Sequence, residues 1–412
     1  MEGIFVGIDI GTTKVCTLIG RVNESGQMEI MGKGMAPCSS VKKGVIVDID
    51  GTSNSIALSV EQAQSEAGLK VYSAYVNIPG MHINALNVRN SINVSGDNRE
   101  ISSRDVQELL RVAKNVELPE DMDIIDVIPR QYIVDGYDEI IDPVGMVGTR
   151  LEVDTDIIAG KITSIQNIIK SLDKAGIKTN GIVPEAFASG VMALSQKDRE
   201  LGVVLIDVGG GITDISVFKN NRLMFCDSIP VGGDHVTNDI SIGLKISYAE
   251  AEKIKKQYGL ALVSLIDNDQ DVWVYDVNDN YRKSVKISEV VEITEARVYE
   301  ILSLCRERLE KAGLYQGFGA GVVLTGRGIS YLDGIRDIAD EVFGLDVRIA
   351  SANVPEGLKP EFATAAGIIK YVSGIAPGQN AGSEVKSGKA KSGRKEGGNI
   401  FKKLSKLISD LF

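Results

Sequence analysis

The chain contains the same short pattern twice, at places far apart in its sequence: an apolar run, an aspartate and a glycine-containing turn. The first copy is IDIGTTK at residues 8–14, and the second is IDVGGGITD at residues 206–214. A second apolar run follows each turn, so each copy predicts two strands joined by a tight turn. A unit used twice in this way predicts two related halves of one molecule.

Both turns are suited to binding phosphate. Glycine lets backbone N–H groups turn toward an anion without a Cβ in the way, while threonine and lysine add further donors. One such turn would equally suit an ordinary hairpin, but two of them indicate a nucleotide held between two halves. Asp9 and Asp207 are hydrogen-bond acceptors that could hold a hydrated Mg²⁺ ion. The predicted phosphate contacts are Gly11, Thr12, Thr13 and Lys14 in the first turn and Gly209, Gly210, Gly211 and Thr213 in the second.

Composition excludes several other classes of protein. A chain of 412 residues exceeds one compact core, and its net charge of −11 argues against nucleic acid as a partner, which needs a basic face. The two histidines and four cysteines show no metal-ligand or disulfide spacing. We therefore expect a reducing cytosol and neither a zinc site nor a His-based catalytic triad. No signal peptide and no apolar run of ~20 residues is found, so a cytosolic protein is expected.

A third glycine-rich stretch lies at residues 319–328. An apolar strand-like run is followed by Thr325, Gly326, Arg327 and Gly328. This loop has no carboxylate, so it suits a flat or neutral part of a ligand; the alternative is a turn that leads from a strand into a helix. The Gly-x-x-x-x-Gly-Lys-Ser/Thr phosphate loop is absent from the sequence.

In order, spacing and residue type, the three stretches resemble the superfamily of actin, sugar kinases and heat-shock chaperones. The resemblance implies an α/β fold of two domains (duplicated ribonuclease-H-like domains) that close on ATP and Mg²⁺, with Gly326, Arg327 and Gly328 at the adenosine. It also implies that Glu252 and Lys255, on a helix near 249–257, reach the ribose and base; a solvated charged helix face is the alternative.

Glu185 begins a predicted helix that resembles the connecting helix of the same superfamily. Its position there implies a residue that orients an attacking water molecule, since positioning dominates phosphoryl transfer. Alternatively, Glu185 only caps the helix after Pro184.

Within the superfamily the chain resembles the bacterial FtsA family of actin-like cell-division proteins over residues 1–372. The helix predicted at 53–67 follows its strand too closely for the insert of actin and the chaperones, and a block of different texture lies at 81–160 instead. The implied organisation is 1–80 with 161–200 and a returning helix near 360–372 as subdomain 1A, 81–160 as an inserted α+β subdomain 1C, 201–242 with 316–359 as subdomain 2A, 243–315 as subdomain 2B, and 373–398 as a flexible linker.

Residues 399–412 predict an amphipathic membrane-targeting helix on that linker. At about 100° per residue, the apolar side chains fall within an arc of roughly 140°. From residue 383 onward there are eight Lys or Arg against three Asp or Glu. Such a helix is typical of an interfacial anchor, although docking onto the protein body is an alternative. The predicted membrane contacts are Phe401, Lys402, Lys403, Leu404, Lys406, Leu407, Ile408, Leu411 and Phe412.

The FtsA resemblance implies an ATP-binding protein, at most a weak ATPase, that self-assembles into filaments. It would tether the FtsZ ring to the anionic cytoplasmic face of the cell membrane at the division septum and contact later division proteins through the inserted subdomain. The carboxy-terminal peptide of FtsZ would dock on residues 243–315, where Arg297, Arg306 and Arg308 are either contacts or plain surface charges. A pilus-assembly adaptor of the PilM type and a small-molecule kinase are the alternatives.

Overall fold

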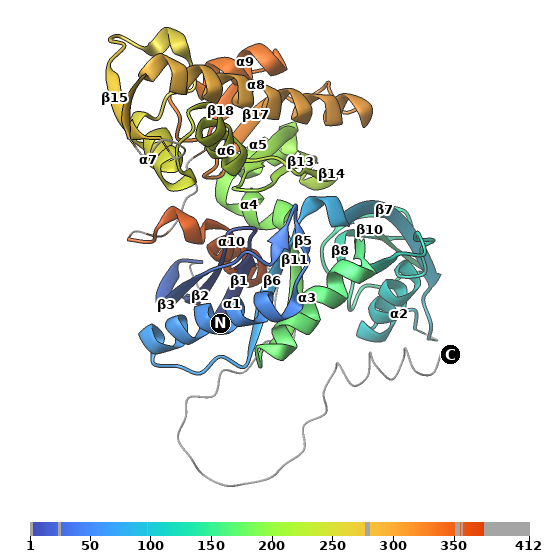
Figure 1. The fold of residues 1–412 in the computed structure, drawn as a ribbon. Coiled ribbons are helices and arrows are strands. Elements are labelled where there is room, and N and C mark those ends of the chain that lie inside the picture. Colours follow the sequence, from blue (N-terminus) through green and yellow to red (C-terminus); the bar gives the residue numbers. More distant parts are fainter. Residues whose placement is uncertain are drawn as a thin grey trace.

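The computed structural model describes residues 3–23, 26–96, 98–276, 281–350, 355 and 357–374. The linker and amphipathic helix predicted beyond residue 374 lie outside these residues. Within them, two domains, each built on a five-stranded mixed sheet, lie against one another (Figure 1). None of the helices in this part of the chain is long and apolar enough to cross a membrane.

The first sheet has the strand order β11-β6-β1-β2-β3 and is covered on both faces. Helices α1 and α3 lie on one face, and α4 and α10 lie on the other (Figure 1). The elements of the first domain are β1 (Gly3–Ile10), β2 (Lys14–Val22), β3 (Met28–Pro37), α1 (Ile49–Ala67), β6 (Ser73–Ile78), α3 (Ile162–Lys174), β11 (Lys178–Pro184), α4 (Glu185–Ala193) and α10 (Ala363–Gly374), with the short strands β4 (Val41–Lys42) and β5 (Val45–Ile46).

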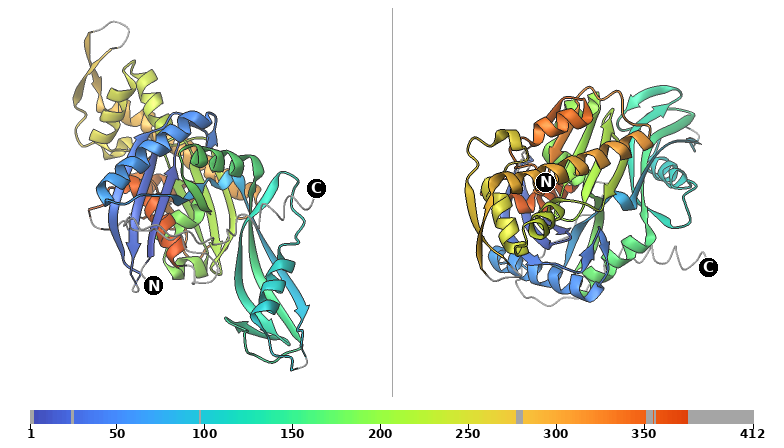
Figure 2. Two further views of the ribbon diagram at one scale, coloured as in Figure 1. Left: turned by 90° about the horizontal axis from the view of Figure 1, so that it is seen from below. Right: turned by 45° about the horizontal axis from the view of Figure 1, so that its top comes forward.

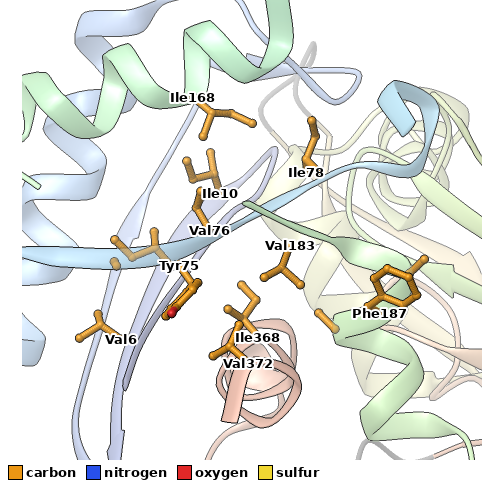
Figure 3. Packing of buried hydrophobic residues seen from close by; sticks show 14 of the residues in the cluster. Val6, Ile10, Tyr75, Val76, Ile78, Ile168, Val183, Phe187, Ile368 and Val372 are labelled. Carbon is orange, nitrogen blue, oxygen red and sulfur yellow. The ribbon is translucent and has the colours of Figure 1, made fainter. Parts of the chain in front are cut away.

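Close packing fixes α1 on this sheet and α10 on α4. A Cβ on Gly34 of β3 would lie 1.9 Å from the carbonyl oxygen of Ser59, and one on Gly367 of α10 would lie 2.2 Å from that of Ala188 in α4. Figure 3 shows side chains of both layers meeting the sheet, with Ile168 of α3 on one side and Ile368 of α10 on the other. The position of α10 matters because this helix follows a loop of the candidate site.

The second sheet has the corresponding order β14-β13-β12-β17-β18. Helices α6, α8 and α9 pack together beside it, and the hairpin β15–β16 projects from one end of the molecule (Figure 2). The elements of the second domain are α5 (Gln196–Leu201), β12 (Val203–Val208), β13 (Thr213–Lys219), β14 (Arg222–Ile229), α6 (Gly233–Gly243), α7 (Tyr248–Tyr258), β15 (Asp271–Tyr275), β16 (Arg282–Lys286), α8 (Ile287–Lys311), β17 (Val322–Thr325), α9 (Ile335–Phe343) and β18 (Val347–Ile349).

A third sheet forms the predicted inserted subdomain, at the opposite end of the molecule from β15–β16 (Figure 2). Its strand order is β7-β10-β8-β9, and α2 packs against β7 and β10. Arg222 of β14 pairs with Asp154 and Asp156 of β10, which attaches this subdomain to the second domain. Its elements are β7 (Ile83–Asn93), α2 (Ser103–Ala113), β8 (Met122–Val134), β9 (Tyr137–Ile140) and β10 (Arg150–Lys161).

Both predicted hairpins are confirmed: β1 pairs with β2 and β12 pairs with β13, each antiparallel across the glycine turn. The helix predicted at 53–67 begins earlier, at Ile49, because the Asp48 side chain accepts the backbone N–H of Gly51 and caps it. The duplicated two-domain α/β architecture with an inserted α+β subdomain is therefore the predicted one.

Candidate nucleotide-binding site

The two glycine turns have the same backbone geometry and touch each other. Each closes with one hydrogen bond, Gly11 N to Lys14 O at 3.0 Å in the first turn and Gly209 N to Ile212 O at 2.9 Å in the second. The backbone N–H of Gly211 donates across the domain boundary to the Thr12 hydroxyl at 3.1 Å. The pattern repeated in the sequence therefore meets its own copy in the fold.

A cavity of about 440 Å³ lies between the domains at this meeting point. All three glycine loops contribute to its walls, together with the start of α4 and the turn before α10. The residues predicted from the sequence that line it are Asp9, Gly11, Thr12, Thr13, Lys14, Glu185, Asp207, Gly209, Gly210, Gly326 and Arg327.

Three other predicted loop residues lie behind the cavity wall. Gly211 bonds to Thr12, and Gly328 donates its N–H to the carbonyl of Val208 at 2.7 Å, which ties the third loop to the second. The buried Thr213 hydroxyl donates to the Val231 carbonyl at 2.8 Å, so it faces the protein interior. These three residues shape the loops without lining the cavity.

Glu252 and Lys255 also stand outside the cavity lining. Lys255 Nζ donates to the Gly233 carbonyl at 2.9 Å and to the Thr237 hydroxyl at 2.7 Å, and Glu252 pairs with Lys255 at 2.7 Å. Only 4% of Lys255 is exposed, so it does not belong to a solvated charged face. The pair instead fixes the first turn of α6, the helix that follows strand β14 of the second sheet.

Buried carboxylates gather at one end of the cavity. Asp9 Oδ1 accepts the Asn77 side-chain amide at 2.9 Å, and the Ser189 hydroxyl donates to Asp207. Burial raises the pKa of Asp9 to about 7, although the charge of Lys14 opposes this shift. Burial likewise raises the pKa of Asp207 and raises that of Glu185 well above its usual value, with nearby Asp214 adding to the shift at Glu185. A cation placed here would relieve this unfavourable burial of negative charge.

This donor set fits a Mg²⁺ ion that is shared with phosphate. Among the described residues, no group of three or more His, Cys, Asp or Glu side chains is arranged to hold a metal ion by itself. Mg²⁺ usually binds through one or two carboxylates, with water and phosphate oxygens as its other ligands. Asp9 and Asp207 can supply the carboxylates, and the N–H groups of both turns can supply donors to phosphate.

Sequence reasoning missed several residues of the site. Asn77 and Ser189 hold the two aspartates, and Asp214 accepts the Gly80 N–H at 3.0 Å and the Ser228 hydroxyl. Asn77 did carry a signal, because it is a polar residue inside the apolar run 74–78. The other cavity residues without such a signal include Tyr331, Ile349, Ala350, Pro360, Glu361, Ala363 and Thr364.

The three arginines predicted as peptide contacts all have partners within the protein. Arg297 Nε lies 2.5 Å from Asp239 Oδ2, and Arg308 lies 3.5 Å from Asp227. Arg306 pairs with Glu310 at 2.7 Å and donates to the Val342 carbonyl at 2.9 Å. They do not line the cavity, and their contact with a peptide stays a prediction.

Comparison with known proteins gives matches along most of the chain. Residues 204–367 match the family model described as "Cell division protein FtsA", and residues 80–159 match the "SHS2 domain inserted in FTSA". The chain is 39% identical over 368 residues to the cell division protein FtsA of Bacillus subtilis (strain 168), covering 89% of this chain and 83% of that protein. It is 32% identical over 415 residues to FtsA of Neisseria meningitidis serogroup B, covering 98% of both chains.

Solved structures show the same fold at lower identity. The PilM-PilN type IV pilus biogenesis complex gives a TM-score of 0.57 at 14% identity, covering 90% of this chain and 99% of that chain. MreB5 of Spiroplasma citri bound to ADP gives a TM-score of 0.51 at 17% identity, covering 90% and 95%. These likenesses show an actin-like fold, and at such identities they show the fold alone.

Proposed function

The chain belongs to the FtsA family of cell division proteins, and on that premise we propose that it binds ATP and Mg²⁺ between its two domains and assembles on the membrane in the nucleotide-bound form. The observation that carries the proposal is the cavity where the two glycine turns meet. A ligand that contacts both turns would fix the angle between the domains. Self-assembly would in turn depend on that angle, so the nucleotide would act mainly as a structural and regulatory ligand.

The residues of the chain have distinct roles in this proposal. Backbone N–H groups of both turns, the hydroxyls of Thr12 and Thr13, and the Lys14 ammonium would bind phosphate oxygens. Asp9 and Asp207 would orient the water ligands of Mg²⁺, which supplies positive charge against the phosphates. Gly326 and Arg327 would contact the adenosine. Residues behind the wall (Gly211, Thr213, Glu252, Lys255 and Gly328) would hold the loops in place.

Glu185 is the residue that would orient a water molecule near the phosphates. Its side chain accepts a weak hydrogen bond from Asn77 at 3.5 Å, and it lines the same cavity as Asp9 and Asp207. A carboxyl group with a raised pKa can accept or hold a proton at this position. We propose that ATP is hydrolysed slowly at most, since a structural role for ATP does not require rapid hydrolysis.

A titration tests the nucleotide site directly. Fluorescent ATP should bind the full-length protein in the presence of Mg²⁺, and Asp207→Asn should weaken binding more in Mg²⁺ than in EDTA. The control is Lys170→Gln, because Lys170 lies on helix α3 of the first domain, outside the cavity. Binding that is equal in Mg²⁺ and EDTA, or equal in wild type and Asp207→Asn, would contradict the metal assignment.

We further propose that residues 399–412 anchor the protein to the cytoplasmic face of the membrane and that the rest of the chain binds the FtsZ ring. Complete separation of apolar and basic residues in that segment supports the anchor. One helix would bind weakly, and assembly would strengthen binding through effective concentration. The partners would be the carboxy-terminal peptide of FtsZ at residues 243–315, a second copy of the chain, and later division proteins at the inserted subdomain.

Co-sedimentation with anionic vesicles tests the anchor. Full-length protein should sediment with the vesicles and recruit an FtsZ tail peptide, with more protein bound in ATP. Deletion of residues 399–412, or Leu404→Asp with Leu407→Asp, should abolish sedimentation, while Ser405→Ala should leave it unchanged. Vesicle binding that survives the deletion would overturn the anchor. Efficient phosphorylation of a sugar would instead favour the kinase alternative.

A further inference from the structure

Arg327 and Glu361 form an ion pair between opposite walls of the cavity. Arg327 belongs to the third glycine loop, after β17 of the second domain. Glu361 belongs to the short turn Pro360–Phe362, which leads into α10 on the first domain. The pair therefore joins the two domains at the place where a nucleotide would lie between them.

The backbone on each side of the pair is held firmly by its own domain. A Cβ at Gly326 would lie 2.4 Å from both Asp207 Oδ1 and the Val208 carbonyl, and Gly328 donates to that carbonyl at 2.7 Å. On the other side, α10 packs so closely on β1 that a Cβ on Gly7 would lie 2.5 Å from the Ala365 carbonyl. A change in the angle between the domains must therefore act on the ion pair itself.

The exposure of the two side chains places them at the rim of the cavity. The Arg327 side chain is 45% exposed and that of Glu361 is 23% exposed. The second carboxylate oxygen, Glu361 Oε2, is buried and has no hydrogen-bond partner. Among the ion pairs of the described residues, no other has both members in the cavity lining.

We propose that Arg327 and Glu361 form a strap across the mouth of the cavity that slows the release of bound nucleotide. This inference rests on the nucleotide site proposed above. Arginine suits the role because its planar fork matches a carboxylate. The strap must break when the domains part, so it opposes opening, and rim exposure makes it sensitive to salt. Glu361 is thus a positioning residue that acts through Arg327.

Release of N-methylanthraniloyl-ATP from the full-length protein in Mg²⁺, chased with excess ATP in a stopped-flow instrument, tests the strap. Glu361→Gln keeps the shape of the side chain and removes its charge, and should speed release about fivefold at low salt, near the upper limit for an exposed ion pair. Added sodium chloride should bring the wild-type rate up to that of the variant and leave the variant little changed.

Two further variants separate a strap from a direct nucleotide contact. The double variant Arg327→Gln with Glu361→Gln shows whether Glu361 acts through Arg327, because it should release nucleotide at the same rate as Arg327→Gln alone. Arg336→Gln breaks an exposed ion pair of α9 outside the cavity and should leave release unchanged.

Three results would overturn the strap: wild-type release by Glu361→Gln, an equal response of both proteins to salt, or a double variant that releases nucleotide faster than Arg327→Gln alone. Failure of the wild type to bind the labelled nucleotide would overturn the nucleotide site together with the strap. Normal binding with unaltered release in Glu361→Gln would overturn the strap alone.

Discussion

The hairpin β1–β2 of the first domain and the hairpin β12–β13 of the second share one backbone design but differ in charge. Asp9 and Asp207 stand at the same position, and in both hairpins a glycine N–H bonds to the carbonyl three residues later. Five residues after the aspartate, the first hairpin has Lys14 and the second has Ile212. Seven residues after it, directly across the strand pair, the first has Cys16 and the second has Asp214.

The side chains that pack over the second strand of each hairpin explain the difference between Cys16 and Asp214. Cys16 is fully buried in an apolar cluster with Phe362 and Ala365 next to α10, and burial raises the pKa of its thiol. At the corresponding position Asp214 receives the Gly80 N–H at 3.0 Å and the Ser228 hydroxyl. The Asp214 carboxylate thus lies where two donors reach it, whereas the Cys16 thiol packs among apolar side chains. The turn thus recurs with the same backbone hydrogen bond, while its surroundings differ between the two copies.

Replacing Cys16 by aspartate makes the first hairpin match the second and is expected to have the largest effect. The new carboxylate would be buried in an apolar cluster without a donor, and a buried charge without a partner costs about 3–5 kcal/mol. Urea unfolding should show this loss, and Cys16→Ala, which adds no charge, should lose less. A Cys16→Asp protein as stable as Cys16→Ala would contradict the role assigned to the apolar cover.

The pH dependence of stability compares one buried carboxyl from each hairpin. Burial raises the pKa of both Asp9 and Asp214 from 3.8 to about 7. Between these values the folded protein keeps the proton while the unfolded chain has lost it, so the unfolding free energy falls as pH rises from about 4 to about 7 and levels off above. At 1.36 kcal/mol per pKa unit, each group contributes a fall of about 4 kcal/mol over this range.

Urea unfolding without nucleotide at pH 5 and pH 8 measures this fall against Asp9→Asn and Asp214→Asn. Each variant lacks one titrating group, so the stability of the wild type relative to the variant should fall between the two pH values. Mg²⁺ with ATP should flatten the dependence, because a bound cation favours the ionised carboxylates. A relative stability that rises with pH would mean that folding lowers the pKa of these carboxyls instead of raising it.

Removing the charge that distinguishes the first hairpin should weaken nucleotide binding. Lys14→Ile reproduces the residue found at the corresponding position of the second hairpin. Loss of a hydrogen bond from a charged group costs about 1.5–3 kcal/mol, or a roughly 10- to 100-fold lower affinity for ATP. Calorimetric titration provides the measurement, and Lys33→Ile on β3, outside the cavity, is the control. Equal affinities of Lys14→Ile and the control would exclude Lys14 as a phosphate ligand.

How far each part of the site was predictable from sequence depends on the sequence distance of its contacts. The first and second turns depend on residues within a few positions, so Gly11 and Gly209 could be identified directly. Thr213 could not be placed, because its hydroxyl is directed inward by the Val231 carbonyl. The sequence resemblance places Lys255 at the ribose and base, with a solvated helix face as the alternative, yet Lys255 is buried against Gly233 and Thr237. Glu361 reaches Arg327 of the third loop only through the packing of α10, which no local pattern describes.

The smallest expected effect concerns the residues that hold the two corresponding aspartates. Asn77 bridges Asp9 and the Ile10 N–H, at 2.9 and 2.8 Å, whereas Ser189 gives Asp207 a single hydrogen bond. Ser189→Ala should therefore lower the unfolding free energy by about 1 kcal/mol, and Asn77→Ala by about twice as much. Ser65→Ala on the exposed face of α1 should stay within about 0.5 kcal/mol of the wild type. Equal losses in Ser189→Ala and Asn77→Ala, measured in urea without nucleotide, would show that the two hairpins are held alike despite their different partners.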